Sequence, residues 1–365
     1  MIDNSILTQI EHITNVHVLP GIIDNIMDGT PLLKRWRSLG MIKAPDAKRE
    51  RLNAVGGTQF DFNIRKAKLD SRGTTSPRAI VPTAPTNTLE RGSITFGMYF
   101  SGYSIDIGEM DANNSKEKII DVMKDKIMEG KDNLIDIMAA GVHAKGTDTD
   151  GITGLPAAVC NSTNAATIGV SATYANIARA TSTWFVSTVD IDTTNYTATN
   201  LSSTMTGGVS YSLPYRMKKM WGNCNQHRAD GKPTLIVTSQ AFADIYEEWA
   251  LSKGSLNMST SMGPTVEGIA RADKQTVDLG FEPFTYKGAP ILVDPYCPTN
   301  DMYFLNENRI WLQSTGSKEL RTTALKEAPN QIMTKVAQFY WRGNLVLTEP
   351  RTCGVIIGDS TTLNY

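Results

Sequence analysis

Few side chains in this 365-residue sequence have the types and spacing that chemistry requires. Cys224 and His227 are separated as zinc ligands often are, but no second pair follows at the spacing of a zinc finger. Because a structural zinc site needs about four ligands, one thiol and one surface imidazole on a helix is the simpler interpretation. Glu247 and Glu248 are adjacent, and adjacent side chains on a helix diverge by about 100°. They therefore favour a solvated face over a catalytic pair.

The sequence also lacks the local motifs of the common enzyme classes. It has no G-x-x-x-x-G-K-[ST] loop, no G-x-G-x-x-G, no G-x-S-x-G and no H-E-x-x-H. Met217, Met220 and Trp221 recur at helical spacing and indicate ordinary core in preference to a ligand pocket. We therefore predict no catalytic residues, no cofactor and no metal, and expect that the protein is not an enzyme. An enzyme or carbohydrate-binding module with a site assembled from distant residues is the alternative.

Composition indicates a globular protein of a reducing compartment. Hydrophobic residues make up 41% of the chain and charged residues 20%, and no apolar run approaches the roughly 20 residues that span a bilayer. The first residues lack the pattern of a secretion signal, so we expect synthesis in a cytosol. There the four scattered cysteines would be buried free thiols.

Charge is distributed unevenly along the chain. The net charge of −1 argues against coating nucleic acid by bulk electrostatics. Residues 34–78, however, carry twelve basic and four acidic side chains, a net +8, which leaves −9 for the remainder. This segment is either a solvated basic stretch or a basic arm that docks on acidic surfaces of sister subunits.

The first hundred residues contain elements that need a partner. In residues 1–55, short apolar clusters are split by proline and glycine, which favours an extended arm over a disordered tail. Residues 58–66 and 93–105 alternate apolar and polar side chains, with Met98 and Phe100 continuing the apolar face of the second strand. They predict a long hairpin with a polar, proline-containing tip. Its apolar face needs either the chain's own core or a neighbouring subunit.

The clearest helix covers residues 115–142. Asn114 and Glu117 resemble a capping box, and apolar residues then recur with the helical period among many charged ones. The helix would be roughly 40 Å long at 1.5 Å per residue, and Gly130 would give it a place to bend.

More irregular and mixed structure follows. Residues 147–212 are rich in Thr, Ser, Asn, Ala and Gly and predict irregular β structure and loops. The remaining predicted elements are a helix over 213–228, a strand over 233–238, a helix after Ser239, hairpins over 281–293 and 302–312, a strand over 332–340 that turns at Gly343-Asn344 into 345–347, and a last strand over 355–357.

Five short segments stand out in the order of these elements. They are Leu19-Pro20-Gly21-Ile22-Ile23-Asp24 with Gly29-Thr30-Pro31-Leu32-Leu33, then Gly151-Ile152-Thr153-Gly154-Leu155, then Phe281-Glu282-Pro283-Phe284 with Gly288-Ala289-Pro290-Ile291-Leu292-Val293-Asp294-Pro295, then Asp301-Met302-Tyr303-Phe304-Leu305-Asn306, and finally Tyr340-Trp341-Arg342-Gly343-Asn344-Leu345 with Pro350-Arg351. Jointly, and over essentially the whole chain, they resemble the tailed-bacteriophage major capsid proteins of the Hong Kong 97-like fold family.

This resemblance implies an α+β capsid fold with five parts. These are an N-terminal arm (1–55), an extended β-hairpin loop (56–106), a peripheral domain that holds a long spine helix (107–149) and the C-terminal strands (326–365), and an axial domain (150–325). The chain would be the major capsid protein of a tailed double-stranded DNA phage. It would assemble as pentamers and hexamers into an icosahedral shell around the genome, in the host bacterial cytoplasm, and remain in the virion capsid.

The resemblance also implies partners. They are further copies of the chain, a portal protein, packaged double-stranded DNA held by non-specific contact, and decoration proteins in some members; no membrane is expected. Because the arm-like residues begin almost at Met1, we expect a separate scaffolding protein. Some members join a hairpin lysine covalently to a neighbour's asparagine. Lys66 or Lys68 with Asn344 would be the candidates here, but these are common residues and we do not expect the link.

Position in the hairpin and the arm selects the expected contacts between subunits. The resemblance implies that the hairpin lies across a neighbouring subunit, which would cover its apolar face and bring basic residues to acidic surfaces such as the long helix. The residues expected in these contacts are Phe60, Phe62, Ile64, Arg65, Lys66, Lys68, Arg72, Arg78, Ile94, Phe96, Arg35 and Arg37.

The nearest alternative is an encapsulin, a bacterial nanocompartment shell protein that shares this fold and encloses cargo enzymes instead of DNA. Genes for a large terminase and a portal beside this one would favour the phage, whereas a peroxidase or ferritin-like gene would favour the encapsulin. A tail-tube or other virion protein is disfavoured by the long helix.

Overall fold

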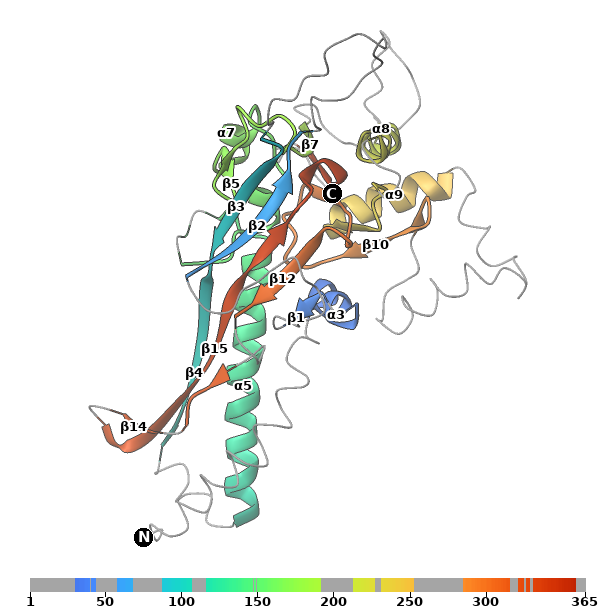
Figure 1. Cartoon of the computed structure of the whole chain (residues 1–365). Coiled ribbons are helices and arrows are strands. Elements are labelled where there is room, and N and C mark those ends of the chain that lie inside the picture. The colour runs from blue at the N-terminus through green and yellow to red at the C-terminus, as the bar shows by residue number, and fades with distance from the viewer. Residues whose placement is uncertain are drawn as a thin grey trace, which may run out of the picture.

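The computed structural model of the chain describes residues 30–39, 41–43, 58–67, 87–106, 116–146, 148, 150–191, 213–226, 231–252, 285–315, 321–324, 326–328 and 331–358. Within these ranges the chain is an α+β protein with two six-stranded sheets, and a long helix lies along one of them (Figure 1). Most of the predicted arm, the tip of the predicted hairpin and residues 192–212 lie outside the described residues.

The first sheet is organised around β15 (Gln331–Leu347), a strand of 17 residues. One edge of β15 pairs with antiparallel β4 (Gly97–Asp106) over the whole length of β4. The strands on its other edge are, in order, β14 (Lys326–Ala328), β13 (Arg321–Thr322) and β12 (Ile310–Ser314), and β1 (Ile42–Lys43) adds to β12 in parallel.

The turn predicted at Gly343-Asn344 is wrong, because β15 runs through both residues without a break. A β-carbon on Gly343 would collide with the carbonyl oxygen of Gln313 on β12, so glycine here permits close approach and does not reverse the chain. The buried Asn344 amide donates to the Thr95 carbonyl oxygen at 2.7 Å and accepts the Thr153 N–H at 2.8 Å. The Asn344 side chain therefore connects β15 to the residue before β4 and to the loop after the long helix.

Helix α5 (Lys116–Val142) confirms the predicted long helix and lies along one face of the first sheet (Figure 1). Its buried residues, such as Ile127, share one hydrophobic core with Tyr103 and Phe339 on the inward face of β4 and β15. Gly130 lies where the helix and sheet are close, since a β-carbon there would be 3.4 Å from both Tyr103 and Phe339. Its role in this structure is therefore close packing of helix on sheet.

The predicted hairpin forms between β2 (Gln59–Arg65) and β3 (Leu89–Thr95), which pair antiparallel along their whole length. Its second strand does not continue as predicted. At Phe96 the chain changes partner from β2 to β15, and the alternation of buried and exposed side chains shifts by one. Met98 and Phe100 consequently face away from α5 and are 51% and 63% exposed, so the prediction that they extend the buried face of the hairpin is wrong.

The second sheet is a compact layer with helices on one side (Figure 1). Its strands are, in spatial order, β7 (Thr188–Ile191), β16 (Gly354–Ile357), β11 (Asp301–Leu305), β8 (Leu235–Thr238), β10 (Ala289–Val293) and β9 (Thr285–Tyr286). A hydrophobic core joins one face of this sheet to α8 (Leu213–Asn225) and α9 (Gln240–Ser252), while the other face belongs to the main core.

The hairpin predicted over 302–312 is wrong, because its two strands belong to different sheets. β11 pairs with β8 and β16 in the second sheet, whereas β12 pairs with β15 and β1 in the first. Residues 306–309 carry the chain from one sheet to the other and hold Glu307 at the junction.

Residues 150–191 form the predicted mixture of short elements and loops. They include α6 (Leu155–Ala158), α7 (Ala165–Ile168), β5 (Thr173–Tyr174) and β6 (Ile177–Ala178). The buried guanidinium of Arg179 gathers these pieces, because it donates to the carbonyl oxygens of Ala158 at 3.0 Å and Ser171 at 3.2 Å. The same group lies 5.4 Å from the ring centre of Tyr174. A short 3-10 turn, η4 (Pro350–Thr352), precedes β16 near the C-terminus.

Candidate functional site: an anchored arm and two contrasting faces

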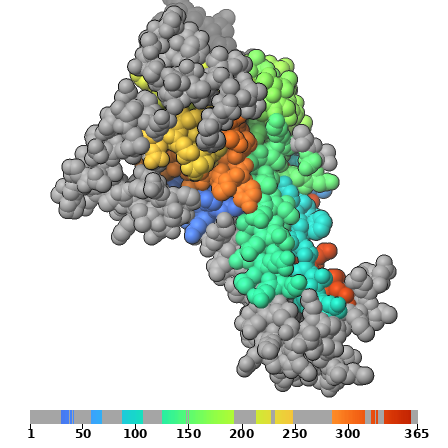
Figure 2. All heavy atoms as spheres, turned by 180° about the vertical axis from the view of Figure 1, so that it is seen from behind, coloured from blue at the N-terminus to red at the C-terminus, as the bar shows by residue number. Residues whose placement is uncertain are grey.

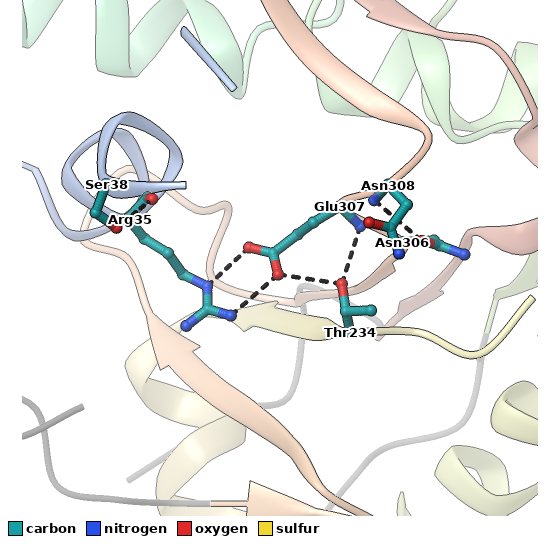
Figure 3. A network of polar contacts seen from close by, with 6 residues as sticks. All are labelled: Arg35, Ser38, Thr234, Asn306, Glu307 and Asn308. Carbon is teal, nitrogen blue, oxygen red and sulfur yellow. Dashed lines mark hydrogen bonds and ion pairs between the residues drawn. The ribbon is translucent and has the colours of Figure 1, made fainter. Parts of the chain in front are cut away.

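The described end of the predicted arm, residues 30–43 without residue 40, is held to the rest of the chain through one buried arginine (Figure 3). Arg35 lies on α3 (Pro31–Ser38), and its Nε and Nη2 donate to the two carboxylate oxygens of Glu307 at 2.7 and 3.0 Å. Thr234, just before β8, donates its hydroxyl to the same carboxylate at 3.1 Å and accepts the Glu307 N–H at 2.9 Å. A two-point pairing of this kind fixes direction as well as distance, so the described part of the arm is locked at the junction of the two sheets.

Apolar packing adds to this anchor. Leu32, Leu33 and Trp36 of α3 are buried in the main core together with Met41. Arg35, which was predicted to contact another subunit, pairs with Glu307 of its own chain in this structure. The side chain of Arg37 lies outside the described residues.

The apolar face of the hairpin is covered by the chain's own core. Phe60, Phe62 and Ile94 are buried there, and the Ser93 N–H donates to the Ala175 carbonyl oxygen at 2.9 Å. Of the two partners that the sequence left open for this face, the chain's own body is the one found. These three side chains offer no free surface to a neighbour.

The other predicted hairpin residues lie at its margin. Ile64 and Phe96 are half-buried, and the Arg342 guanidinium lies 5.2 Å from the ring centre of Phe96. Arg65 is exposed, and the Lys66 ammonium is 3.5 Å from the Glu90 carboxylate. Lys68, Arg72 and Arg78 lie outside the described residues.

The outer side of α5 is an exposed acidic surface. Figure 2, seen from behind, shows α5 as a continuous ridge along the body. Two half-buried lysines, Lys126 and Lys131, flank it. The exposed residues of its described part, 125–142, are what we call the acidic ridge: Asp125, Met128, Glu129, Asp132, Asn133, Asp136, Ile137 and Ala140.

The face of the first sheet that points away from α5 is a different surface, and the sequence analysis missed it. Residues directly opposite each other in an antiparallel pair share a face, so Phe100 lies beside Tyr340, and Met98 beside Arg342. Tyr340 in turn lies opposite Arg321 on β13. We call this surface the open face; its members are Met98, Phe100, Gly102, Ser104 and Asp106 of β4, Thr334, Val336, Gln338, Tyr340 and Arg342 of β15, and Arg321 and Lys326. Only the shift of alternation at Phe96 reveals it.

Polar pairs join the end of α5 to the second sheet. His143 Nε2 is 3.4 Å from Asp294 Oδ2, and both side chains are almost fully enclosed. The Tyr296 hydroxyl donates to the exposed Asp136 at 2.5 Å. These two pairs hold the turn before β11 against α5. Within β11, the Tyr303 hydroxyl donates to the buried Asp301 at 2.6 Å, and burial raises the pKa of Asp301, an effect that this hydrogen bond opposes.

Of the residues considered first for chemistry, most are packed as core, one is half-buried on α9, and the others lie outside the described residues. Met217, Met220 and Trp221 are buried between α8 and the second sheet, which confirms their interpretation as core. Cys224 is also buried, while His227 lies outside the described residues. Glu247 is half-buried, and the side chain of Glu248 is not among those described.

Within the described ranges, no three His, Cys, Asp or Glu side chains are placed to hold a metal ion. No helix among the described residues is both long and apolar enough to span a membrane. All four cysteines are free and buried, as predicted, and burial raises the pKa of each thiol.

No protein-family model and no curated protein matches the sequence. Among solved structures, the chain is similar to the Cyanophage A-1(L) capsid asymmetric unit, with a TM-score of 0.54, 16% identity, and coverage of 88% of this chain and 92% of that one. The chain has the Hong Kong 97-like capsid fold. A second structure, the capsid of a native GTA particle, superposes with a TM-score of 0.50 and 12% identity over 84% of this chain and 86% of the other. The Hong Kong 97-like fold and the α+β class expected from the sequence are therefore confirmed.

Proposed function

We propose that the chain is the major capsid protein of a tailed double-stranded DNA phage, assembling as pentamers and hexamers into an icosahedral shell. The observation that carries this proposal is the extent of the likeness to the cyanophage capsid chain, which covers 88% of this chain and 92% of that one. The role of the chain would be to build a shell and not to catalyse a reaction. Its buried polar groups are used in holding the arm and α5 in place.

In this proposal the parts keep the boundaries expected from the sequence. Residues 1–55 are the N-terminal arm and 56–106 the extended loop. Residues 107–149 and 326–365 form the peripheral domain with α5 as the spine helix, and 150–325 form the axial domain. The first sheet draws β4, β12 and β15 from the loop, axial and peripheral parts in turn, so the domain division describes layout and not independent folding units.

The proposed partners follow from the same function. They are other copies of the chain, a separate scaffolding protein during assembly, a portal protein, packaged DNA by non-specific contact, and decoration proteins. The proposed location is the virion capsid, after assembly in the host bacterial cytoplasm.

We further propose that the polar side of the hairpin meets the acidic ridge of another copy. The apolar side of the hairpin is already buried in the core of its own chain. The basic residues of the hairpin would therefore make this contact: Arg65, Lys66, Lys68, Arg72 and Arg78. Each exposed charge pair contributes little, roughly 0–1 kcal/mol. Many identical contacts formed at once make dissociation rare.

The first test is size-exclusion chromatography and negative-stain electron microscopy of the chain expressed alone and with its neighbouring genes. Closed shells, or capsomer-sized rings that close when a scaffold is supplied, are the expected result. A monomer that never assembles, even with those partners, would contradict the proposal. Double-stranded DNA inside shells from the native source supports the phage, whereas an enclosed enzyme would support an encapsulin.

A charge-reversal pair tests the hairpin contact. Glu129→Lys with Asp132→Lys on the acidic ridge should reduce assembly while leaving the melting temperature of the unassembled chain nearly unchanged, because both side chains are exposed. Asp244→Lys on the exposed side of α9 makes the same kind of change elsewhere and is the control. Equal assembly of both variants would contradict the contact.

A further inference from the structure

Strand β4 lies at the border of the first sheet, because among the described strands it pairs only with β15 (Figure 1). The pairing runs through ten successive residue pairs without a register shift. Residues 97–105 contain no proline and no charged side chain. Natural proteins protect exposed sheet edges with charges, prolines, bulges or short length, because an unprotected edge pairs with other strands. Over residues 97–105, β4 has none of these protections.

The other edge strands of the described sheets are protected. β1, β5, β6, β9 and β13 have two residues each, and β7 has four. β14 carries a lysine and a glutamate and has a register shift before Ala328. β2 and β3 of the hairpin also contain charged residues. Among the described strands, β4 is therefore the long, regular and uncharged edge.

Alternate residues of β4 direct their backbone groups away from β15. In an antiparallel pair, successive residues point their N–H and C=O groups alternately to the partner strand and away from it. The Met98 N–H points away, since it donates to the Asp150 carbonyl oxygen at 2.8 Å. Arg342, opposite Met98, agrees with this, because its carbonyl oxygen accepts from the Thr315 N–H on the β12 side. The residues that follow with the same orientation are Phe100, Gly102 and Ser104. Their backbone groups have no hydrogen-bond partner in the part of the chain that the structure describes.

These free backbone groups are symmetric about Gly102. When a second β4 pairs antiparallel with the two Gly102 residues opposite each other, Phe100 of each copy lies opposite Ser104 of the other. Each copy then donates three N–H groups and accepts three, so every free group is used. Shifting the register by two residues would bring in Met98, whose N–H is already bonded to Asp150. No like charges are opposed in the symmetric register.

The glycine at the centre of this register is not required by its own chain. A β-carbon on Gly102 would meet its nearest neighbour, on Gln338, at an ordinary 3.8 Å. Glycine within a strand often marks a place where another backbone approaches closely. In the symmetric register, Phe100 of one copy lies diagonally beside Gly102 of the other on the open face, and an aromatic ring beside an edge glycine helps to fix register.

We propose that β4 pairs antiparallel with β4 of a second copy about a twofold axis at Gly102. The inference rests on the proposed shell-building function and adds a contact that ring formation does not supply. Pentamers and hexamers close through head-to-tail contacts, whereas a self-complementary contact about a twofold axis joins one ring to the next. Residues opposite each other share a face, so the open faces of the two copies become one continuous surface.

Cysteine cross-linking of the assembled full-length chain tests the register. The four native thiols are buried and burial raises the pKa of each, so an introduced cysteine reacts selectively. In the proposed register the two Gly102 α-carbons are about 5.5 Å apart, and Gly102→Cys should give a covalent dimer with a short bifunctional thiol reagent. The two Ser104 residues are four positions apart along the ladder, roughly 13 Å. Ser104→Cys alone should therefore lose most of the product, and mixing it with a Phe100→Cys chain should restore it.

A proline tests the free edge itself. Ser104→Pro removes an N–H that points away from β15, so the chain's own ladder stays intact and its melting temperature should change little. Added to Gly102→Cys, it removes two hydrogen bonds from each pair of copies and should lower the dimer yield by about tenfold or more. Ser104→Thr keeps the N–H and is the matched control. In the unsubstituted chain, assembly should protect the amides of Phe100, Gly102 and Ser104 from hydrogen exchange.

Several outcomes would overturn the inference. They are shells that form without a Gly102→Cys dimer, equal yields from Gly102→Cys and Ser104→Cys alone, and an unchanged yield with Ser104→Pro. Amides of residues 100–104 that stay unprotected on assembly would do the same. Protection of these amides without the Gly102→Cys dimer would mean that a different strand occupies the edge, which also contradicts self-pairing. Failure of the unsubstituted chain to form any shell or ring is a separate result that removes the proposed function itself.

Discussion

The two sheets of this protein differ in how completely the chain covers them. The second sheet has helices and core on one face and the main core on the other, and all five residues of β11 are buried. The first sheet is covered less evenly. On the side of α5, Phe339 and Trp341 are fully enclosed, whereas Phe100 on the other side is 63% exposed. Both sides are buried where β15 pairs with β12, so the exposed part is limited to β4 and the stretch of β15 beside it.

The largest expected effect compares one phenylalanine from each surface. Phe304→Ala in β11 should lower the free energy of unfolding by about 3–5 kcal/mol, because it opens a cavity in a closed core. Phe100→Ala should lower it by less than about 1 kcal/mol, because its side chain is largely in water already. Chemical denaturation of the unassembled chain measures both. A comparable loss from the two changes would show that the open face is covered within the chain.

The ion pair between Arg35 and Glu307 allows a second comparison, at the junction of the two sheets. Arg35→Ala leaves the Glu307 carboxylate enclosed without its two-point partner and should cost about 3 kcal/mol. Hydrogen exchange should then accelerate in α3 more than in β11. The double variant Arg35→Ala with Glu307→Ala should recover part of the loss, since no charge is stranded. No recovery would mean that apolar packing of α3 is the main anchor.

An amide-to-acid pair compares a buried and an exposed position on β15. Asn344→Asp replaces the donor to the Thr95 carbonyl oxygen by an acceptor at a buried position and should cost about 1–3 kcal/mol. Gln338→Glu makes the same change at an exposed position of the same strand and should cost less than about 0.5 kcal/mol. Thermal melts of the two variants measure the difference. Equal losses would contradict the assignment of Asn344 as enclosed and Gln338 as exposed.

The smallest expected effect concerns the buried acid of the closed sheet. Burial raises the pKa of Asp301 in the folded chain, so its ionised form destabilises the fold at neutral pH, and this cost disappears once pH falls below the ordinary pKa of aspartate, about 3.9. Asp301→Asn, whose amide oxygen still accepts the Tyr303 hydroxyl, should therefore raise the melting temperature at pH 7 and lose that advantage in acid. An advantage that grows in acid would contradict the assignment, and Asp244→Asn on the exposed side of α9 is the matched control.

Elements fixed by local periodicity were predictable from the sequence. The alternation in residues 58–66 and the helical period in 115–142 predicted β2 and α5 correctly, because each has one strongly buried side. The same alternation misled at Met98 and Phe100, because a change of strand partner at Phe96 leaves no mark in composition. Gly343-Asn344 has the residues of a turn, but its glycine is required by a neighbouring strand that is distant in sequence.

Contacts between distant segments could not be predicted. Arg35 and Glu307 are separated by 272 residues, and nothing local marks either as the other's partner. The basic character of residues 34–78 suggested a docking arm, yet Arg35 is used to fasten that arm to its own body. The same is true of the hairpin residues Phe60, Phe62 and Ile94. Their alternation predicted an apolar face, but it could not predict whether the same chain or a neighbouring subunit covers that face.

The parallel course of α5 and β15 has a mechanical consequence. At about 1.5 Å per helical residue and about 3.3 Å per strand residue, the 27-residue helix and the 17-residue strand are stiff rods of roughly 40 and 56 Å. Bending such a two-layer strut would stretch one ladder of hydrogen bonds and compress the other, and Gly130 lets the layers touch closely enough to resist sliding. The enclosed pair of His143 and Asp294 connects the end of this strut to the second sheet. Because both sheets also share one hydrophobic core, load applied along α5 would be passed to the second sheet.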